Sequence, residues 1–132
     1  MLKYAEEILK ANENSPLAVV VTTTKGELMG FASRLSDTDR LADENRFLQS
    51  LAEHGEAKII CGLCKWRNGN VDIPSANLRK SLEELSTANL EAEFLLQGGE
   101  GFQLRSIGAM RSGRYSLPET AFPLPSAIRE NT

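Results

Sequence analysis

The chain has 132 residues, of which 41% are hydrophobic and 25% are charged. This length suits one domain with a substantial core, and this composition excludes a chain that is disordered throughout. The net charge of −3, from 18 acidic and 15 basic residues, makes nucleic-acid binding an unfavoured function. No uncharged stretch is long enough to cross a membrane, and the N-terminus carries acids where a signal peptide is basic and then apolar. We therefore expect a cytoplasmic protein without membrane contact.

The first predicted unit is a helix followed by a hairpin. Apolar residues recur at helical spacing over residues 2–13, and Asn14-Ser15-Pro16 ends the helix because proline cannot continue it. Residues 17–24 are rich in β-branched side chains, which favour a strand, and their successive valines suggest a strand covered on both faces. A turn at Lys25-Gly26 leads to a return strand over residues 28–34.

The same order of elements returns in the next unit. Several possible N-caps over residues 36–39 begin a helix that ends near Gly55. An apolar strand follows over residues 57–66. Asn68-Gly69 is the strongest short hairpin signal in the chain, and it predicts a brief return strand over residues 71–73.

The third unit opens at Pro74-Ser75, and the leucines that follow share one helical face. Strands are predicted over residues 92–97 and 102–110, on either side of the glycine run at 98–101. A phosphate-binding loop needs glycines that lead into a helix, whereas the residues after this run indicate another strand. The run is therefore interpreted as a hairpin turn.

Three loosely repeated αββ units predict a single α+β domain over residues 1–110, with a mostly antiparallel sheet and helices on one face. The helix-hairpin-helix start is also compatible with a profilin- or roadblock-like sandwich, a comparison that rests on element order alone. Residues 111–132 include four prolines or glycines and little periodicity, which is typical of a C-terminal tail.

The only histidine and both cysteines lie within residues 54–64. His54-Gly55-Glu56 followed by Cys61-Gly62-Leu63-Cys64 resembles the His-x-Glu and Cys-x-x-Cys elements of zinc deaminases. In that family a helix and a strand lie between the two elements. Here only four residues separate them, and Ile60 stands where the family has proline. We therefore reject this resemblance and predict no catalytic residue.

A structural zinc site is the other interpretation of the two cysteines. Residues three apart on a strand point to opposite faces, so Cys61 and Cys64 suit neither a shared metal ion nor a local disulfide. A bend at Gly62 would reopen the metal alternative. We predict no metal and no cofactor, with both thiols behaving as small buried hydrophobes. His54 suits the end of a helix, where the helix dipole favours a cation.

No pattern supplies a nucleophile, an acid–base pair, a metal set or a cofactor loop. We therefore expect a small protein-interaction or regulatory domain of the adaptor or inhibitor type rather than an enzyme. Its partner would be another protein or a second copy of this chain, as a homodimer. Tryptophan and arginine are enriched among interface anchors. The predicted interaction residues are Trp66, Arg67, Arg111, Arg114 and Tyr115.

The alternative interpretation is an enzyme or ligand-binding domain for a phosphorylated small molecule. The polar segment at 34–46 lies between a predicted hairpin and a predicted helix, where binding residues often occur. The basic segment at 105–114 has no acidic residue and suits a phosphate. The predicted ligand-binding residues are Arg34, Asp37, Asp39, Arg40 and Arg105.

Overall fold

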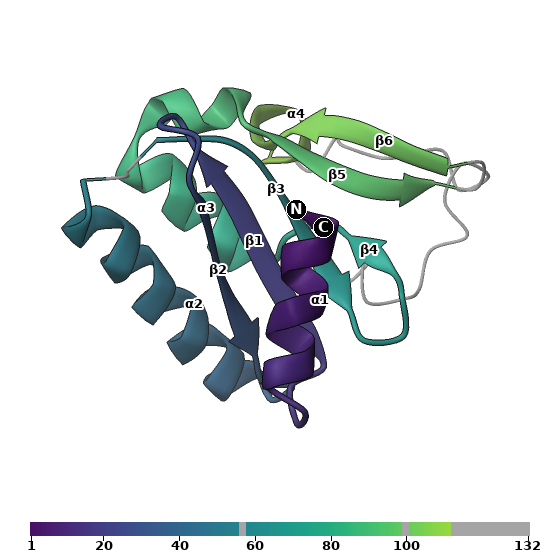
Figure 1. Ribbon diagram of the computed structural model, residues 1–132. Coiled ribbons are helices and arrows are strands. Elements are labelled where there is room, and N and C mark those ends of the chain that lie inside the picture. Colours follow the sequence, from purple (N-terminus) through teal and green to yellow (C-terminus); the bar gives the residue numbers. More distant parts are fainter. Residues whose placement is uncertain (56–57, 99–100, 112–132) are drawn as a thin grey trace.

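The computed structural model describes residues 1–55, 58–98 and 101–111 (Figure 1). The elements follow the order α1 (Leu2–Ala11), β1 (Leu17–Thr23), β2 (Leu28–Ser33), α2 (Asp37–Glu53), β3 (Ile59–Trp66), β4 (Val71–Asp72), α3 (Ala76–Leu85), the 3-10 helix η1 (Thr87–Glu91), β5 (Glu93–Gly98), β6 (Gly101–Ser106) and α4 (Ile107–Arg111). The last predicted strand is too long, because the chain turns into a short helix from Ile107 onward.

The strands form one mixed sheet in the order β2-β1-β3-β5-β6, with β4 paired to β3 off this path. β3 and β5 run parallel, whereas the other pairings are antiparallel. Parallel neighbours need a long crossover connection, and the segment with α3 and η1 supplies it. The prediction of a single α+β domain is confirmed, and its sheet is mixed.

Helices cover both faces of the sheet, so the expectation that they lie on one face is wrong (Figure 1). Successive side chains of a strand point to opposite faces. Val19 and Val21 of β1 pack in a core with α2 and α3, whereas Ala18 and Val20 pack in a second core with α1. A strand that is apolar at every position requires such cover on each side.

The two cysteines lie on opposite faces of β3, as the alternation predicts. Cys64 is 1% exposed and belongs to the core beneath α2 and α3. Cys61 Sγ lies 3.9 Å from Met1 Sδ, on the side of α1. His54 ends α2, where its Nδ1 lies 2.8 Å from the carbonyl oxygen of Ser50. The segment that looks most like a catalytic site in the sequence is therefore a packed central strand and a helix end.

Gly62 does not bend this strand. A Cβ atom at this position would lie 2.7 Å from Phe94 Cζ and 2.9 Å from the carbonyl oxygen of Val20, closer than real Cβ contacts. The glycine is needed because β3 packs closely against its neighbours. The bend that would have brought the two thiols together is absent from β3, which pairs with β1 without a break from Cys61 to Trp66.

Within the described residues, no helix combines the length and apolar character needed to cross a membrane. The predicted tail covers residues 111–132. Arg111 is the last residue of α4, and the rest of the tail, with Arg114 and Tyr115, lies outside the described residues.

Candidate functional site

A buried carboxylate, that of Glu44, joins α2 to the start of α3. Glu44 is 2% exposed. Its Oε2 accepts a 2.7 Å hydrogen bond from Ser75 Oγ, and its Oε1 accepts a 2.9 Å hydrogen bond from Asn77 Nδ2. Arg40 Nε lies 3.6 Å from Oε2. A buried charge is costly unless it is paired and hydrogen-bonded, and these partners together meet that requirement.

Helix capping positions these side chains. Ser36 begins α2 by accepting a hydrogen bond from the Asp39 backbone N–H, and Ser75 begins α3 by accepting one from the Leu78 N–H at 3.1 Å. Both are the residue types preferred at this position. Ser75 therefore caps α3 with its oxygen and donates its hydroxyl proton to Glu44. The carboxylate lies at the N-terminal end of α3, where the helix dipole favours a negative charge.

Arg40 extends the cluster from Glu44 toward a second acid. Its guanidinium carbon lies 5.6 Å from the centroid of the Trp66 ring, a cation–π distance. Its Nε is buried and has no hydrogen-bond partner. Asp72, at the end of β4, is 7% exposed. Burial raises the pKa of Asp72 to about 6, although the charge of Arg40 acts in the opposite direction.

Beside this cluster an open hollow of about 410 Å³ runs along α3. It is lined by Ala76, Arg79, Lys80 and Glu83. Arg79 is 7% exposed, and its Nη1 donates a 2.9 Å hydrogen bond to the carbonyl oxygen of Pro74, one residue before the cap of α3. The hollow therefore lies next to the segment that supplies Ser75 and Asn77.

A separate ion pair anchors β2 to α2. Asp43 Oδ2 accepts hydrogen bonds from the backbone N–H and Nε of Arg34, and Asp43 Oδ1 lies 3.0 Å from Arg34 Nη2. Burial alone would raise the pKa of Asp43, but the hydrogen bonds and charge of Arg34 hold it below its ordinary value. Asp39 Oδ1 also lies 3.5 Å from Arg34 Nη1. The bidentate contact between Arg34 and Asp43 fixes the backbone at the connection from β2 to α2.

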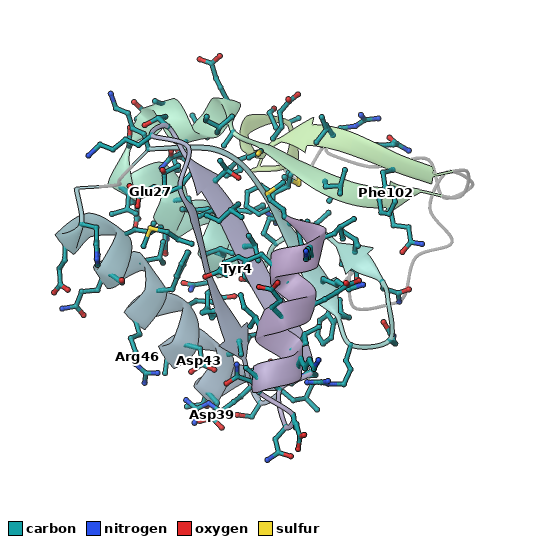
Figure 2. All side chains as sticks on the ribbon, viewed as in Figure 1. Tyr4, Glu27, Asp39, Asp43, Arg46 and Phe102 are labelled. Carbon is teal, nitrogen blue, oxygen red and sulfur yellow. The ribbon has the colours of Figure 1, made fainter. Side chains whose placement is uncertain are left out.

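The structure keeps the two predicted ligand-binding segments apart. Arg34, Asp37, Asp39 and Arg40 lie between β2 and the first turns of α2, and β2 is one edge of the sheet. Arg105 lies on β6, the opposite edge, and its Nη1 donates to the adjacent carbonyl oxygen of Leu104. Figure 2 shows the same separation, with the labelled Asp39 and Asp43 on α2 far from Phe102 on β6. Arg105 therefore lies on the edge of the sheet opposite to the residues at 34–40.

Intramolecular contacts occupy the predicted interaction residues on the β3–β4 hairpin. Trp66 is half-buried and packs against the core as well as beneath Arg40. The guanidinium of Arg67 links the β3–β4 hairpin to the C-terminal end of α1, because the last carbonyl groups of a helix have no hydrogen-bond partner within the helix. Its Nη2 donates to the carbonyl oxygens of Leu9, Asn12 and Ser15 at 2.8–2.9 Å.

Comparison with known proteins gives a fold and no closer assignment. No family model and no curated protein matches the chain. Among solved structures, the cytidine deaminase from Mycobacterium leprae is 18% identical with a TM-score of 0.56, covering 78% of this chain and 92% of its own. The cytidine deaminase from Mycobacterium tuberculosis is 14% identical with a TM-score of 0.59, covering 88% and 98%. At this identity the likeness establishes the cytidine deaminase fold alone.

This likeness overturns the functional expectation from the sequence. The proteins that share the fold are enzymes, so the interpretation as a protein-binding, regulatory domain of the adaptor or inhibitor type is wrong. The likeness to cytidine deaminase structures also replaces the comparison with a profilin- or roadblock-like sandwich. That comparison rested on element order, whereas the structure also shows the strand order and the parallel β3–β5 pair.

Zinc deaminases provide a pattern against which the cluster is compared. Three histidine or cysteine side chains hold the metal, in the spacing His-x-Glu and Pro-Cys-x-x-Cys, and the glutamate transfers protons without binding the metal. The same spacing occurs here at Ala42-Asp43-Glu44 on α2 and at Pro74-Ser75-Ala76-Asn77-Leu78 at the start of α3. The contact between Ser75 and Glu44 brings the two segments together.

The residues at the three metal positions do not fit zinc. Ala42 and Leu78 carry no donor atom, and Ser75 offers a hydroxyl in place of a thiolate or imidazole. In the part of the chain that the structure describes, no three His, Cys, Asp or Glu side chains form a group suited to a metal ion. Glu44 is therefore the only charged residue of the zinc deaminase pattern that this chain retains.

Glu44 is not among the residues predicted from the sequence, because histidine and cysteine are the residues by which a deaminase pattern is recognised. His54 ends α2 and the two cysteines lie on β3, so these residues are located between Glu44 and the start of α3 in the sequence. The available signal was a glutamate on the helix after the first hairpin, followed by Pro74-Ser75 at the next helix start. Without its metal ligands, the pattern has little in the sequence to distinguish it.

Proposed function

We propose that this chain binds a nucleobase or nucleoside through the carboxylate of Glu44, on a cytidine deaminase fold. The observation that carries the proposal is the pair of hydrogen bonds from Ser75 and Asn77 to the two oxygens of Glu44. They hold a buried carboxylate in one orientation where α2 meets α3. The fold neighbours, which are named as cytidine deaminases, support the choice of ligand class.

The chemistry of the cluster suits a planar ligand that both donates and accepts hydrogen bonds. A carboxylate offers about four lone-pair sites. Ser75 and Asn77 use one site on each oxygen of Glu44, which leaves sites for an amino group or ring N–H. Arg40 Nε lies 3.6 Å from Glu44 Oε2 and makes no hydrogen bond, so its N–H is a donor for a ring carbonyl or ring nitrogen. A cytosine ring carries an amino donor beside such acceptors.

Zinc-dependent hydrolysis forms no part of this proposal. That reaction needs a metal-activated water, and the side chains at the three metal positions of this chain are unsuitable ligands. Glu44 and its partners are expected to bind and orient the ligand.

Thermal unfolding in the presence of ligands tests the proposal, because a ligand that binds only the folded state raises the apparent stability. The panel contains cytidine, uridine, cytosine, adenosine and inorganic phosphate. We expect at least one base or nucleoside to raise the melting temperature and phosphate alone to have no effect. The Glu44→Gln variant should lose this response, whereas Glu6→Gln, a change at an exposed glutamate of α1, should retain it. A flat panel for the wild-type chain would refute the proposal.

A further inference from the structure

We infer that the junction of α2 and α3 is a deaminase-type metal centre whose ligands have been replaced, with the Ser75–Glu44 hydrogen bond holding the helices together in place of a metal ion. This inference concerns the metal, and it stands whichever small molecule the site binds. It predicts that the wild-type chain takes up no stoichiometric zinc. It also predicts that restoring the missing side chains restores zinc binding.

The hydrogen bond has the properties of such a replacement. A metal centre of this pattern takes ligands from both helices and thereby cross-links them. Here Ser75 Oγ and Glu44 Oε2 lie 2.7 Å apart, a short distance typical of a hydroxyl that donates to a carboxylate. Asn77 adds a second contact between the same helices. The cross-link therefore remains, although it is made of hydrogen bonds.

Nearby thiols cannot substitute for the missing ligands. Cys61 and Cys64 lie on opposite faces of β3, so they cannot share one ion with the junction. Burial raises the pKa of the Cys64 thiol, which disfavours the thiolate form that binds metals.

The backbone retains the spacing that a metal site needs. Ser75 and Leu78 are one helical turn apart, and Ser75 Oγ lies 3.1 Å from the Leu78 N–H. Side chains three residues apart share a helix face. Ala42 lies two positions before Glu44, on the helix that Ser75 contacts. Ala42 is exposed on α2. Three cysteines at positions 42, 75 and 78 would reproduce the sequence spacing of the deaminase ligands, and zinc binding tests whether the three thiolates reach one ion.

The decisive experiment compares the metal content of two triple variants. Ala42→Cys/Ser75→Cys/Leu78→Cys restores the spacing. Its matched control, Ala42→Cys/Ser75→Cys/Leu82→Cys, carries the same number of new thiols and replaces another leucine of α3 that is also 0% exposed. Both proteins, purified without a metal-affinity tag, are dialysed against zinc. We expect about one tightly held zinc ion per chain in the first variant and much less in the control, measured by elemental analysis.

Cobalt(II) provides a second measurement, because thiolate ligands give its complexes a characteristic absorption. We expect that absorption in the restored variant and its absence from the wild-type chain. If the restored variant fails to fold, Ala42→Cys/Ser75→Cys keeps the core leucine, and it should bind cobalt more tightly than either single substitution.

Two results would overturn the inference. One is stoichiometric zinc in the wild-type protein. The other is equal zinc uptake by the restored variant and the Leu82 control, since the spacing would then be irrelevant. Neither result depends on the nucleoside panel, so failure of this inference is distinguishable from failure of the proposed ligand binding.

Discussion

Ser75 Oγ and Glu44 Oε2 lie 2.7 Å apart although 31 positions separate the two residues in the chain. The contact places a helix cap and a buried carboxylate in a single hydrogen-bond network at the junction of α2 and α3. Its parts have separable contributions to stability, and these can be measured by substitution.

Replacing Ser75 with alanine should destabilise the chain more than the loss of an ordinary cap. The change removes the cap of α3, which contributes about 1 kcal/mol, and a hydrogen bond to a charged acceptor, which contributes about 1.5–3 kcal/mol. We expect a loss of about 2–4 kcal/mol in the free energy of unfolding, measured with urea. Ser36→Ala is the matched control because Ser36 caps α2 and makes no contact with Glu44. Equal losses in the two variants would contradict the dual role of Ser75.

Replacing Glu44 with glutamine should also lower stability, although the side-chain shape is unchanged. Ser75 and Asn77 each donate to one oxygen of Glu44, and the amide nitrogen of glutamine cannot accept from one of them. The cost of leaving a buried polar group unpaired is about 1–3 kcal/mol. Glu53→Gln, at the exposed end of α2, should change the free energy of unfolding by less than about 0.5 kcal/mol. An equally small change at Glu44 would show that its hydrogen bonds contribute little.

Asp72 should make the chain less stable as the pH rises from acidic to neutral. Its folded-state pKa is about 6 and its ordinary value is 3.8, so between these values the folded state binds more protons than the unfolded state. Stability therefore falls as the pH rises through this window and is constant above it. The full shift corresponds to about 3 kcal/mol, which screening near the surface reduces to about 1–2 kcal/mol.

The Asp72→Asn variant removes this dependence. We expect it to unfold at a higher temperature than the wild-type chain at pH 8 and at nearly the same temperature at pH 4. Thermal unfolding followed by circular dichroism at both pH values checks this. The charge of Arg40 acts on Asp72 in the opposite direction. If the variant were less stable at pH 8, attraction to Arg40 would outweigh burial, and the expected sign would be wrong.

Asp43 should show the opposite pH dependence. Its folded-state pKa lies below the ordinary value of 3.8 because of Arg34, so the pair stabilises the chain above that value, and the contribution is lost as the pH falls through the folded-state pKa. Asp43→Asn should cost about 1–2 kcal/mol at pH 7, since Asp43 is buried and its partner is half exposed. The cost should shrink in acid. A cost that is independent of pH would indicate lost packing instead of a lost ion pair.

Much of the fold could be predicted because it follows from local pattern. Helical spacing after Met1, β-branched residues before Lys25 and the Asn68-Gly69 turn each identify an element from its own residues, and each element is present in the structure. The capping role of His54 and the opposite directions of the two cysteines also follow from helix and strand geometry. Local steric preference is sufficient for such features.

The relation between elements required the tertiary structure. Successive valines in β1 indicated cover on both faces, but the sequence did not show which helix lies on which side. The parallel pairing of β3 with β5 and the Ser75–Glu44 contact both join residues about 30 positions apart. Such contacts depend on how whole elements pack, because a carboxylate on an isolated helix has no preferred distant partner. The sequence therefore determined most of the helices and strands, although not η1 or α4. Packing alone decided that Glu44 is buried and that a serine from the next helix holds it.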